Sequence, residues 1–147
     1  AVARSKDEGL LCVMRNEGGG WLWVMASQDG GASWSAPQDS GFANPGSPAA
    51  IHRLMNGHLL LVFNDSSAAR TNFTAAISVD GGVSWPYRRA LADPQEKCSY
   101  PAVTQSPDGT IHVLFSVGRE RIDHSAFQEI GFLDADASAR SKACPPE

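Results

Sequence analysis

The chain has 147 residues, and its 42% hydrophobic and 19% charged residues are typical of one globular domain. Its formal net charge is -4 and its Lys and Arg residues are scattered, so nucleic acid is not an expected partner. No apolar run approaches the roughly 20 residues that span a bilayer, so no membrane-spanning segment is expected. The three cysteines include no Cys-x-x-Cys pair, and no histidine stands at metal-ligand spacing, so we expect no metal site.

The first predicted unit, residues 1–40, contains the glycine-led apolar strand "GLLCVMR" at 9–15 and the segment "SQDGGASW" at 27–34. In such a segment the aspartate can accept hydrogen bonds from turn amides, and the glycines supply backbone angles closed to other residues. The tryptophan is expected to bury its ring between strands. The segment is therefore predicted to be a structural turn, and the residues that define it are Ser27, Asp29, Gly31 and Trp34.

The middle unit, 41–93, reads as four strands: "AAIHRLM", "HLLLVFN", "FTAAISV" and "SWPYRRAL". Asn56-Gly57 separates the first two, and this dipeptide predicts a hairpin with a type I′ turn, which needs positive φ at both positions. The segment "SVDGGVSW" at 78–85 repeats the earlier turn, since Ser27 and Ser78 are 51 residues apart. Its structural marker residues are Ser78, Asp80, Gly82 and Trp85.

The third unit, 94–133, has three recognisable strands, "PAVTQS", "TIHVLFS" and "RIDHSAF", with Asp108-Gly109 between the first two. The polar tail, 134–147, is predicted to be disordered. No helical periodicity appears between the strands. The fold class is therefore all-β, and units of about 50 residues with four antiparallel strands match the blades of a β-propeller.

The segments "SQDGGASW" and "SVDGGVSWP" resemble the Asp boxes, or BNR repeats, of the sialidase (neuraminidase) superfamily. The similarity covers nearly all of 9–127, and the order of elements resembles the C-terminal portion of a sialidase-like domain. The resemblance implies a six-bladed propeller of which only about three blades are present, near 1–40, 41–93 and 94–133. The chain is then expected to be a fragment that lacks the N-terminal half of the propeller.

The resemblance implies an exo-α-sialidase type of glycoside hydrolase, which removes terminal sialic acids from glycoconjugates and needs no cofactor. An anionic nucleophile would be repelled by the carboxylate of this sugar, which gives a reason for a tyrosine nucleophile. By position in the match, Tyr100 is the nucleophile, while Arg15 and Arg70 bind the substrate carboxylate, since planar guanidinium groups pair directionally with carboxylates. Possible further substrate contacts are Asn44, Asn64, Asp65 and His124.

The partner Glu of the nucleophile is expected at or just before Ala1, and the first arginine and the acid–base Asp belong to the missing half. The chain alone is therefore expected to be inactive. Two alternatives stay open: a non-catalytic Asp-box propeller that binds glycans or proteins, and a propeller hydrolase that acts on another acidic sugar. From composition alone, Arg15 and Arg70 would be interpreted as ordinary loop or rim residues, and Tyr100 as a core aromatic at a strand start.

Overall fold

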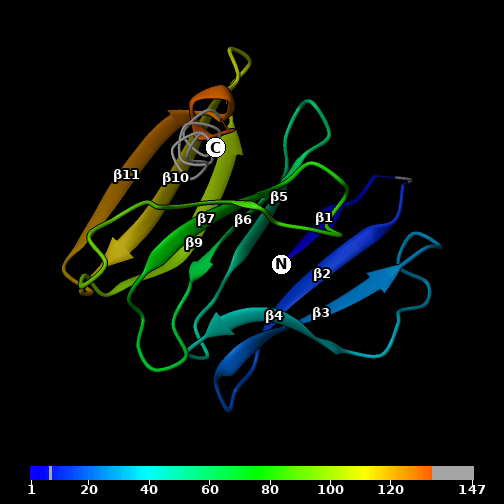
Figure 1. Ribbon diagram of the computed structural model, residues 1–147, viewed down its shortest axis with the longest axis horizontal. Coiled ribbons are helices and arrows are strands. Elements are labelled where there is room, and N and C mark those ends of the chain that lie inside the picture. The colour runs from blue at the N-terminus through cyan, green and yellow to red at the C-terminus, as the bar shows by residue number, and fades with distance from the viewer. Residues whose placement is uncertain (7, 134–147) are drawn as a thin grey trace, which may run out of the picture.

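Three antiparallel sheets lie side by side in a computed structural model that describes residues 1–6 and 8–133 (Figure 1). The first sheet has the order β1-β2-β3-β4, with β1 (Val2–Arg4), β2 (Leu10–Arg15), β3 (Gly20–Ser27) and β4 (Gln38–Asn44). The second has the order β5-β6-β7-β8, with β5 (Ala50–Arg53), β6 (Leu59–Asn64), β7 (Phe73–Ser78) and β8 (Tyr87–Ala90). The third has the order β11-β10-β9, with β9 (Cys98–Gln105), β10 (Thr110–Val117) and β11 (Arg121–Gln128).

The all-β prediction is confirmed, with one helical turn at 129–133 after the last strand. No helix in the described part of the chain is long and apolar enough to cross a membrane. The tail that was predicted to be disordered, 134–147, lies outside the described residues.

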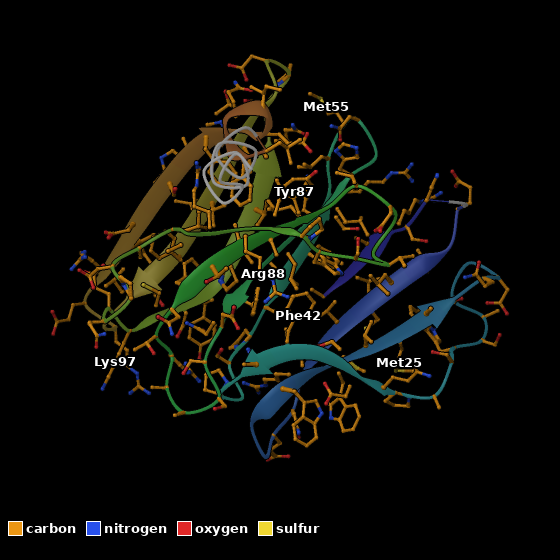
Figure 2. All side chains as sticks on the ribbon, in the orientation of Figure 1. Met25, Phe42, Met55, Tyr87, Arg88 and Lys97 are labelled. Atoms are coloured by element: carbon orange, nitrogen blue, oxygen red, sulfur yellow. The ribbon has the colours of Figure 1, made fainter. Side chains whose placement is uncertain are left out.

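The two central strands of the second sheet are buried on both faces because this sheet lies between the other two. Every residue of β6 and β7 is buried, and both strands read as almost continuous apolar runs. On one face Phe73 packs against Phe115 of the third sheet, with ring centroids 4.6 Å apart. On the other face Phe63 packs against Phe42 of the first sheet, at 5.0 Å. Figure 2 shows Phe42 together with Arg88, whose guanidinium lies 4.7 Å from the Phe42 ring centre.

The hairpin predicted at Asn56-Gly57 is present, but its type I′ turn is wrong. Only Gly57, with φ of 89°, lies in the left-handed region, and the loop has three residues. The Gly57 amide donates to the Leu54 carbonyl and the Leu54 amide donates to the His58 carbonyl, both at 2.8 Å. This is the three-residue loop that needs a left-handed backbone at its last position alone. The Ser106–Thr110 loop has the same two bonds, at 2.9 Å, with Gly109 at φ of 87°.

The repeated segments 27–34 and 78–85 form two nearly identical turns, from β3 to β4 and from β7 to β8. In the second, Asp80 accepts hydrogen bonds from the Val83 amide, the Ser84 amide and the Ser78 hydroxyl at 3.1, 2.9 and 2.7 Å. The Ser78 hydroxyl in turn accepts from the Gly82 amide at 2.8 Å. The first turn has the same arrangement around its own carboxylate, and its bonds join Asp29 to Ser27 and Ser33, and Gly31 to Ser27.

The two tryptophans of these turns differ in their surroundings. Each indole donates to a glycine carbonyl of its own turn, Trp34 to Gly31 and Trp85 to Gly82. Trp85 packs against Phe42 of the first sheet, with ring centroids 5.8 Å apart. Trp34 is 36% exposed, so the expected burial of this ring between strands is wrong. The reason is that, among residues 1–6 and 8–133, no further sheet lies against the outward face of the first one (Figure 1).

Because the strands are antiparallel, the strand ends and their connecting loops lie alternately at two opposite ends of each sheet, which form two edges of the domain. Both aspartate turns lie at one edge, where β3 and β7 end. At the opposite edge, which we call the Arg70 edge, β2, β6 and β10 end and β3, β7 and β11 begin. The first strands of the sheets are also neighbours, because β5 packs against both β1 and β9. Loops from all three sheets therefore meet at the Arg70 edge.

A buried polar network joins the three sheets at the Arg70 edge. Asn44, Ser47 and Asn64 are fully buried. The Ser47 amide donates to Asn44 Oδ1 at 2.9 Å, and the Ser47 hydroxyl donates to Asn64 Oδ1 at 2.7 Å. Asn64 Nδ2 then donates to the backbone carbonyls of Thr71 and Cys98, at 3.2 and 3.1 Å. These bonds run from the end of the first sheet, through the second, to the first residue of β9.

We predict that Asn64→Ala lowers the free energy of unfolding by about 2–3 kcal/mol, because it leaves the Ser47 hydroxyl and the carbonyls of Thr71 and Cys98 without their partner. The matched control is Asp65→Ala, whose carboxylate makes one partly exposed ion pair, with Arg88 at 3.4 Å. Such a pair contributes at most about 1 kcal/mol. Urea unfolding of both variants measures the difference, and equal effects would contradict the structural role of the network.

Acid should weaken the second aspartate turn. Hydrogen bonds, chiefly from Ser84 and also from Ser78 and Val83, lower the pKa of Asp80 from 3.8 to about 2. A lowered folded-state pKa means that the stabilisation is present above the unfolded-state value and is lost as pH falls through the folded-state value. Between about pH 4 and pH 2, Asp80→Asn should therefore lose less stability than the parent chain. Urea unfolding across this range checks this, and parallel losses in the two proteins would refute it.

Candidate active site

Tyr100 occupies an unusual backbone position at the start of β9. The register with β10 shifts there, because Leu114 pairs with Ala102 while Ser116 pairs with Ser99. One extra residue on β9 is thus accommodated as a β-bulge. Tyr100 has φ of 56°, in the left-handed region, and its side chain is 60% exposed.

This backbone conformation is strained. A residue with a Cβ pays about 1–2 kcal/mol in the left-handed region, and the residue before a proline, here Pro101, ordinarily takes an extended conformation. Strain of this kind persists only where the surroundings fix it, and it concentrates at functional sites. Here the backbone is fixed by hydrogen bonds to Cys98, two residues before Tyr100. The Cys98 carbonyl accepts from Asn64 Nδ2, and the Cys98 amide donates to the Arg70 carbonyl at 2.9 Å.

Arg70 lies beside Tyr100. The Arg70 guanidinium carbon is 5.5 Å from the centre of the Tyr100 ring, and its Nη1 donates to the Ser99 hydroxyl at 3.2 Å. The pKa of Tyr100 is lowered, first by hydrogen bonding of Arg70 to the phenolate and then by the positive charge of Arg70, with smaller effects from Arg15 and Arg119. The arrangement favours a more acidic phenol next to a guanidinium that can receive an anion.

These side chains line an open hollow of about 510 Å³ at the Arg70 edge. The residues that line it are Ala69, Arg70, Lys97, Ser99, Tyr100, Ser116, Gly118 and Arg119. Figure 2 shows Lys97 toward the lower left of the molecule, next to the first residue of β9. Arg15, the last residue of β2, is not among the lining residues, but its charge reaches the Tyr100 phenol. The hollow therefore carries several cations, and its lining contains no carboxylate.

The other sequence-predicted contacts lie elsewhere. Asn44 and Asn64 are fully buried in the network that joins the sheets. Asp65 follows β6 and pairs with Arg88. His124 lies on the third sheet and stacks on His112, with His112 Nδ1 3.0 Å from His124 Nε2. None of these four side chains lines the hollow around Tyr100.

Sequence reasoning missed several residues of the hollow, notably Lys97, Ser99, Ser116 and Arg119. Ser116 donates to the Ser99 carbonyl at 3.0 Å, across the bulge that carries Tyr100. The sequence does contain a signal for the turn that carries Arg119. The residues "VGRE" lie between two predicted strands, and a two-residue turn that begins with glycine is typical of a β-hairpin. Nothing in the sequence indicates that this turn reaches the hollow.

Other chemistries have little support in the described residues. Within 1–6 and 8–133, no group of three or more His, Cys, Asp or Glu side chains is placed to hold a metal ion. The Cys98 thiol is buried beneath the site, and burial, together with Glu96 and Asp123, raises its pKa to about 11. A thiol in this state is protonated at neutral pH and is a poor nucleophile. Tyr100, in contrast, is an exposed group of the hollow with nucleophilic potential.

The architecture matches solved sialidase structures. The Hadza microbial sialidase Hz136 is 25% identical, with a TM-score of 0.76 over 89% of this chain and 27% of that chain. The intramolecular trans-sialidase from Ruminococcus gnavus, solved with oseltamivir carboxylate, is 20% identical, with a TM-score of 0.77 over 90% of this chain and 32% of that chain. The leech intramolecular trans-sialidase, solved with 2,7-anhydro-Neu5Ac, is 19% identical, with a TM-score of 0.75 over 89% and 23%.

This chain thus spans between about a quarter and a third of each of these relatives. No curated protein sequence matches it. The family model for the BNR repeat-like domain matches residues 1–113, which is most of the chain. The chain therefore belongs to the BNR repeat-like domain family and is a BNR-repeat domain of the sialidase superfamily.

Proposed function

We propose that this chain forms part of an exo-α-sialidase-type glycoside hydrolase that acts on terminal sialic acids. In this proposal Arg70, assisted by Arg15, binds the carboxylate of the sugar, and Tyr100 is the nucleophile. The observation that carries the proposal is the pairing of a strained, exposed Tyr100 with Arg70, whose guanidinium lowers the phenol pKa. The named activity of the Hadza microbial sialidase supports it.

The chemistry follows from the charge of the substrate. A carboxylate nucleophile would be repelled by the sugar carboxylate, whereas a phenol is neutral until its proton leaves. The Tyr100 oxygen attacks the anomeric carbon while its proton passes to a general base. The bond to the leaving group breaks as the acid–base Asp donates a proton to the departing oxygen. Water then cleaves the tyrosyl–sugar bond and restores the phenol. In the proposal the base, a further arginine and the acid–base Asp come from blades outside this chain.

The same proposal makes the three sheets consecutive blades of a larger, six-bladed propeller. Its support is that both outer sheets expose large apolar side chains. The first exposes Trp21 and Trp34, and the third exposes Leu114 and Ile122, the last at 69%. Trp85 covers the boundary between the first and second sheets, and the equivalent Trp34 would cover the boundary with a preceding blade.

The two tryptophans test the propeller. In this chain Trp85→Ala should cost about 2 kcal/mol or more, and Trp34→Ala less than about 1 kcal/mol, because Trp34 has little to pack against. In a longer protein with a preceding blade, the two substitutions should cost similar amounts. Chemical unfolding of both proteins measures this, and a Trp34→Ala effect that stays small in the longer protein would reject the additional blade.

Activity on a fluorogenic sialoside, measured for this chain within its complete propeller, tests the function. Tyr100→Phe should lower kcat/KM by about 10³-fold or more, because it removes the attacking oxygen. Arg70→Ala should raise KM by about tenfold or more, because a carboxylate loses its guanidinium partner. The matched control is Tyr87→Phe at the other tyrosine of the chain, which lies on β8 and should keep full activity.

The outcome separates the candidate functions. Full activity in Tyr100→Phe would remove the nucleophile assignment. Binding of sialic acid that depends on Arg70, without turnover in the parent, would favour a glycan-binding propeller. Turnover of a uronic acid glycoside, with no turnover of the sialoside, would favour a hydrolase for another acidic sugar.

A further inference from the structure

The hollow around Tyr100 is lined by two cations, Lys97 and Arg119, to which the proposed function gives no role. Arg70, Lys97 and Arg119 all line it, and none of its eight lining residues is acidic. The chain as a whole has a net charge of -4, so the positive charge of this hollow is opposite in sign to that of the chain. A concave site lined by one sign of charge attracts the opposite sign.

Two nearby carboxylates, those of Glu96 and Asp123, are paired with a different arginine. Arg121 Nη2 donates to Glu96 at 2.6 Å, and Arg121 Nε donates to both oxygens of Asp123 at 2.9 and 3.1 Å. In the described part of the chain, neither Lys97 nor Arg119 has a carboxylate within 4 Å. Glu120, beside Arg119, lines a neighbouring depression instead. Lys97 and Arg119 therefore keep their charges available to a ligand.

The backbone holds these two cations together. Gly118 and Arg119 both have positive φ, at 60° and 65°, in the turn between β10 and β11. This conformation is ordinary for Gly118 and strained for Arg119, whose Cβ crowds the backbone there. The Gly118 amide donates to the Lys97 carbonyl at 2.9 Å, which fixes the turn against the residue before β9. Backbone strain concentrates at functional sites, so the strained backbone of Arg119 supports a binding function at the hollow.

We propose that Lys97 and Arg119 form a second anion subsite beside Arg70 and Tyr100, which selects an acidic sugar that carries a further anionic ester group. The inference rests on the proposed function, in which Arg70 receives the sugar carboxylate. Lys97 and Arg119 then receive the second group, and the guanidinium of Arg119 binds its oxygens in a directional manner. The substrate class is thus a sialic acid with a sulfate ester, in preference to the unsubstituted sugar.

The test compares two probes by calorimetry on this chain within its complete propeller: N-acetylneuraminic acid and its 8-O-sulfate ester. The sulfated sugar should bind about tenfold more tightly, as expected for one charge-assisted contact. Arg119→Gly and Lys97→Ala should each remove most of this preference while binding of the unsubstituted sugar stays. Arg119→Gly also relieves the strained φ, so its thermal unfolding temperature should not fall below that of the parent.

The controls separate this inference from the proposed function. Arg4→Ala removes one positive charge at an exposed ion pair outside the hollow, and it should keep the preference for the sulfated sugar. Equal affinity of the parent for both sugars, with both lost in Arg70→Ala, would overturn the second subsite alone. A preference that Arg119→Gly and Lys97→Ala leave intact would also overturn it. Absence of binding of either sugar to the parent would overturn the proposed function and this inference together.

Discussion

The need to pair buried polar groups fixes the Arg70 edge of this domain. Asn44, Ser47 and Asn64 have no contact with solvent, so each amide and hydroxyl must find a partner within the protein. They find it in one another and in the carbonyls of Thr71 and Cys98. No buried side-chain polar atom in the described residues lacks a partner. A fully paired network has one favourable geometry, so it sets the position of β9 relative to the first two sheets.

That fixed geometry explains how the site can hold two strained residues. Tyr100 and Arg119 both have left-handed backbones, and each stands one or two residues from an anchored position. Cys98 is held by Asn64 and by the Arg70 carbonyl, and Gly118 is held by the Lys97 carbonyl. The favourable packing of the three sheets offsets the backbone strain at these two positions. As a result, side chains from loops far apart in the sequence meet in one cationic hollow.

Local signals predicted much of this fold from the sequence. The repeated aspartate turns depend on residues within seven positions of one another, so their pattern is readable directly. The burial of Asn44 and Asn64 is not, because their partners lie up to 34 residues away and polar residues at strand ends resemble loop residues. Arg70 and Tyr100 were found only through resemblance to a family. Arg119 was missed because its turn lines the hollow only when β9 and β10 are aligned, and the burial of Trp34 was mispredicted because the adjacent face of the first sheet is uncovered.

Nuclear magnetic resonance can measure directly whether Arg70 lowers the pKa of the Tyr100 phenol. The chain has two tyrosines, so carbon-13 labelling at the phenol carbon gives two signals, and Tyr100→Phe assigns them. We expect the Tyr100 signal to titrate below the ordinary tyrosine range and Arg70→Ala to move its pKa upward, since hydrogen bonding and charge from Arg70 are the main causes of the shift. A Tyr100 titration that is the same in the parent and in Arg70→Ala would contradict this role of Arg70.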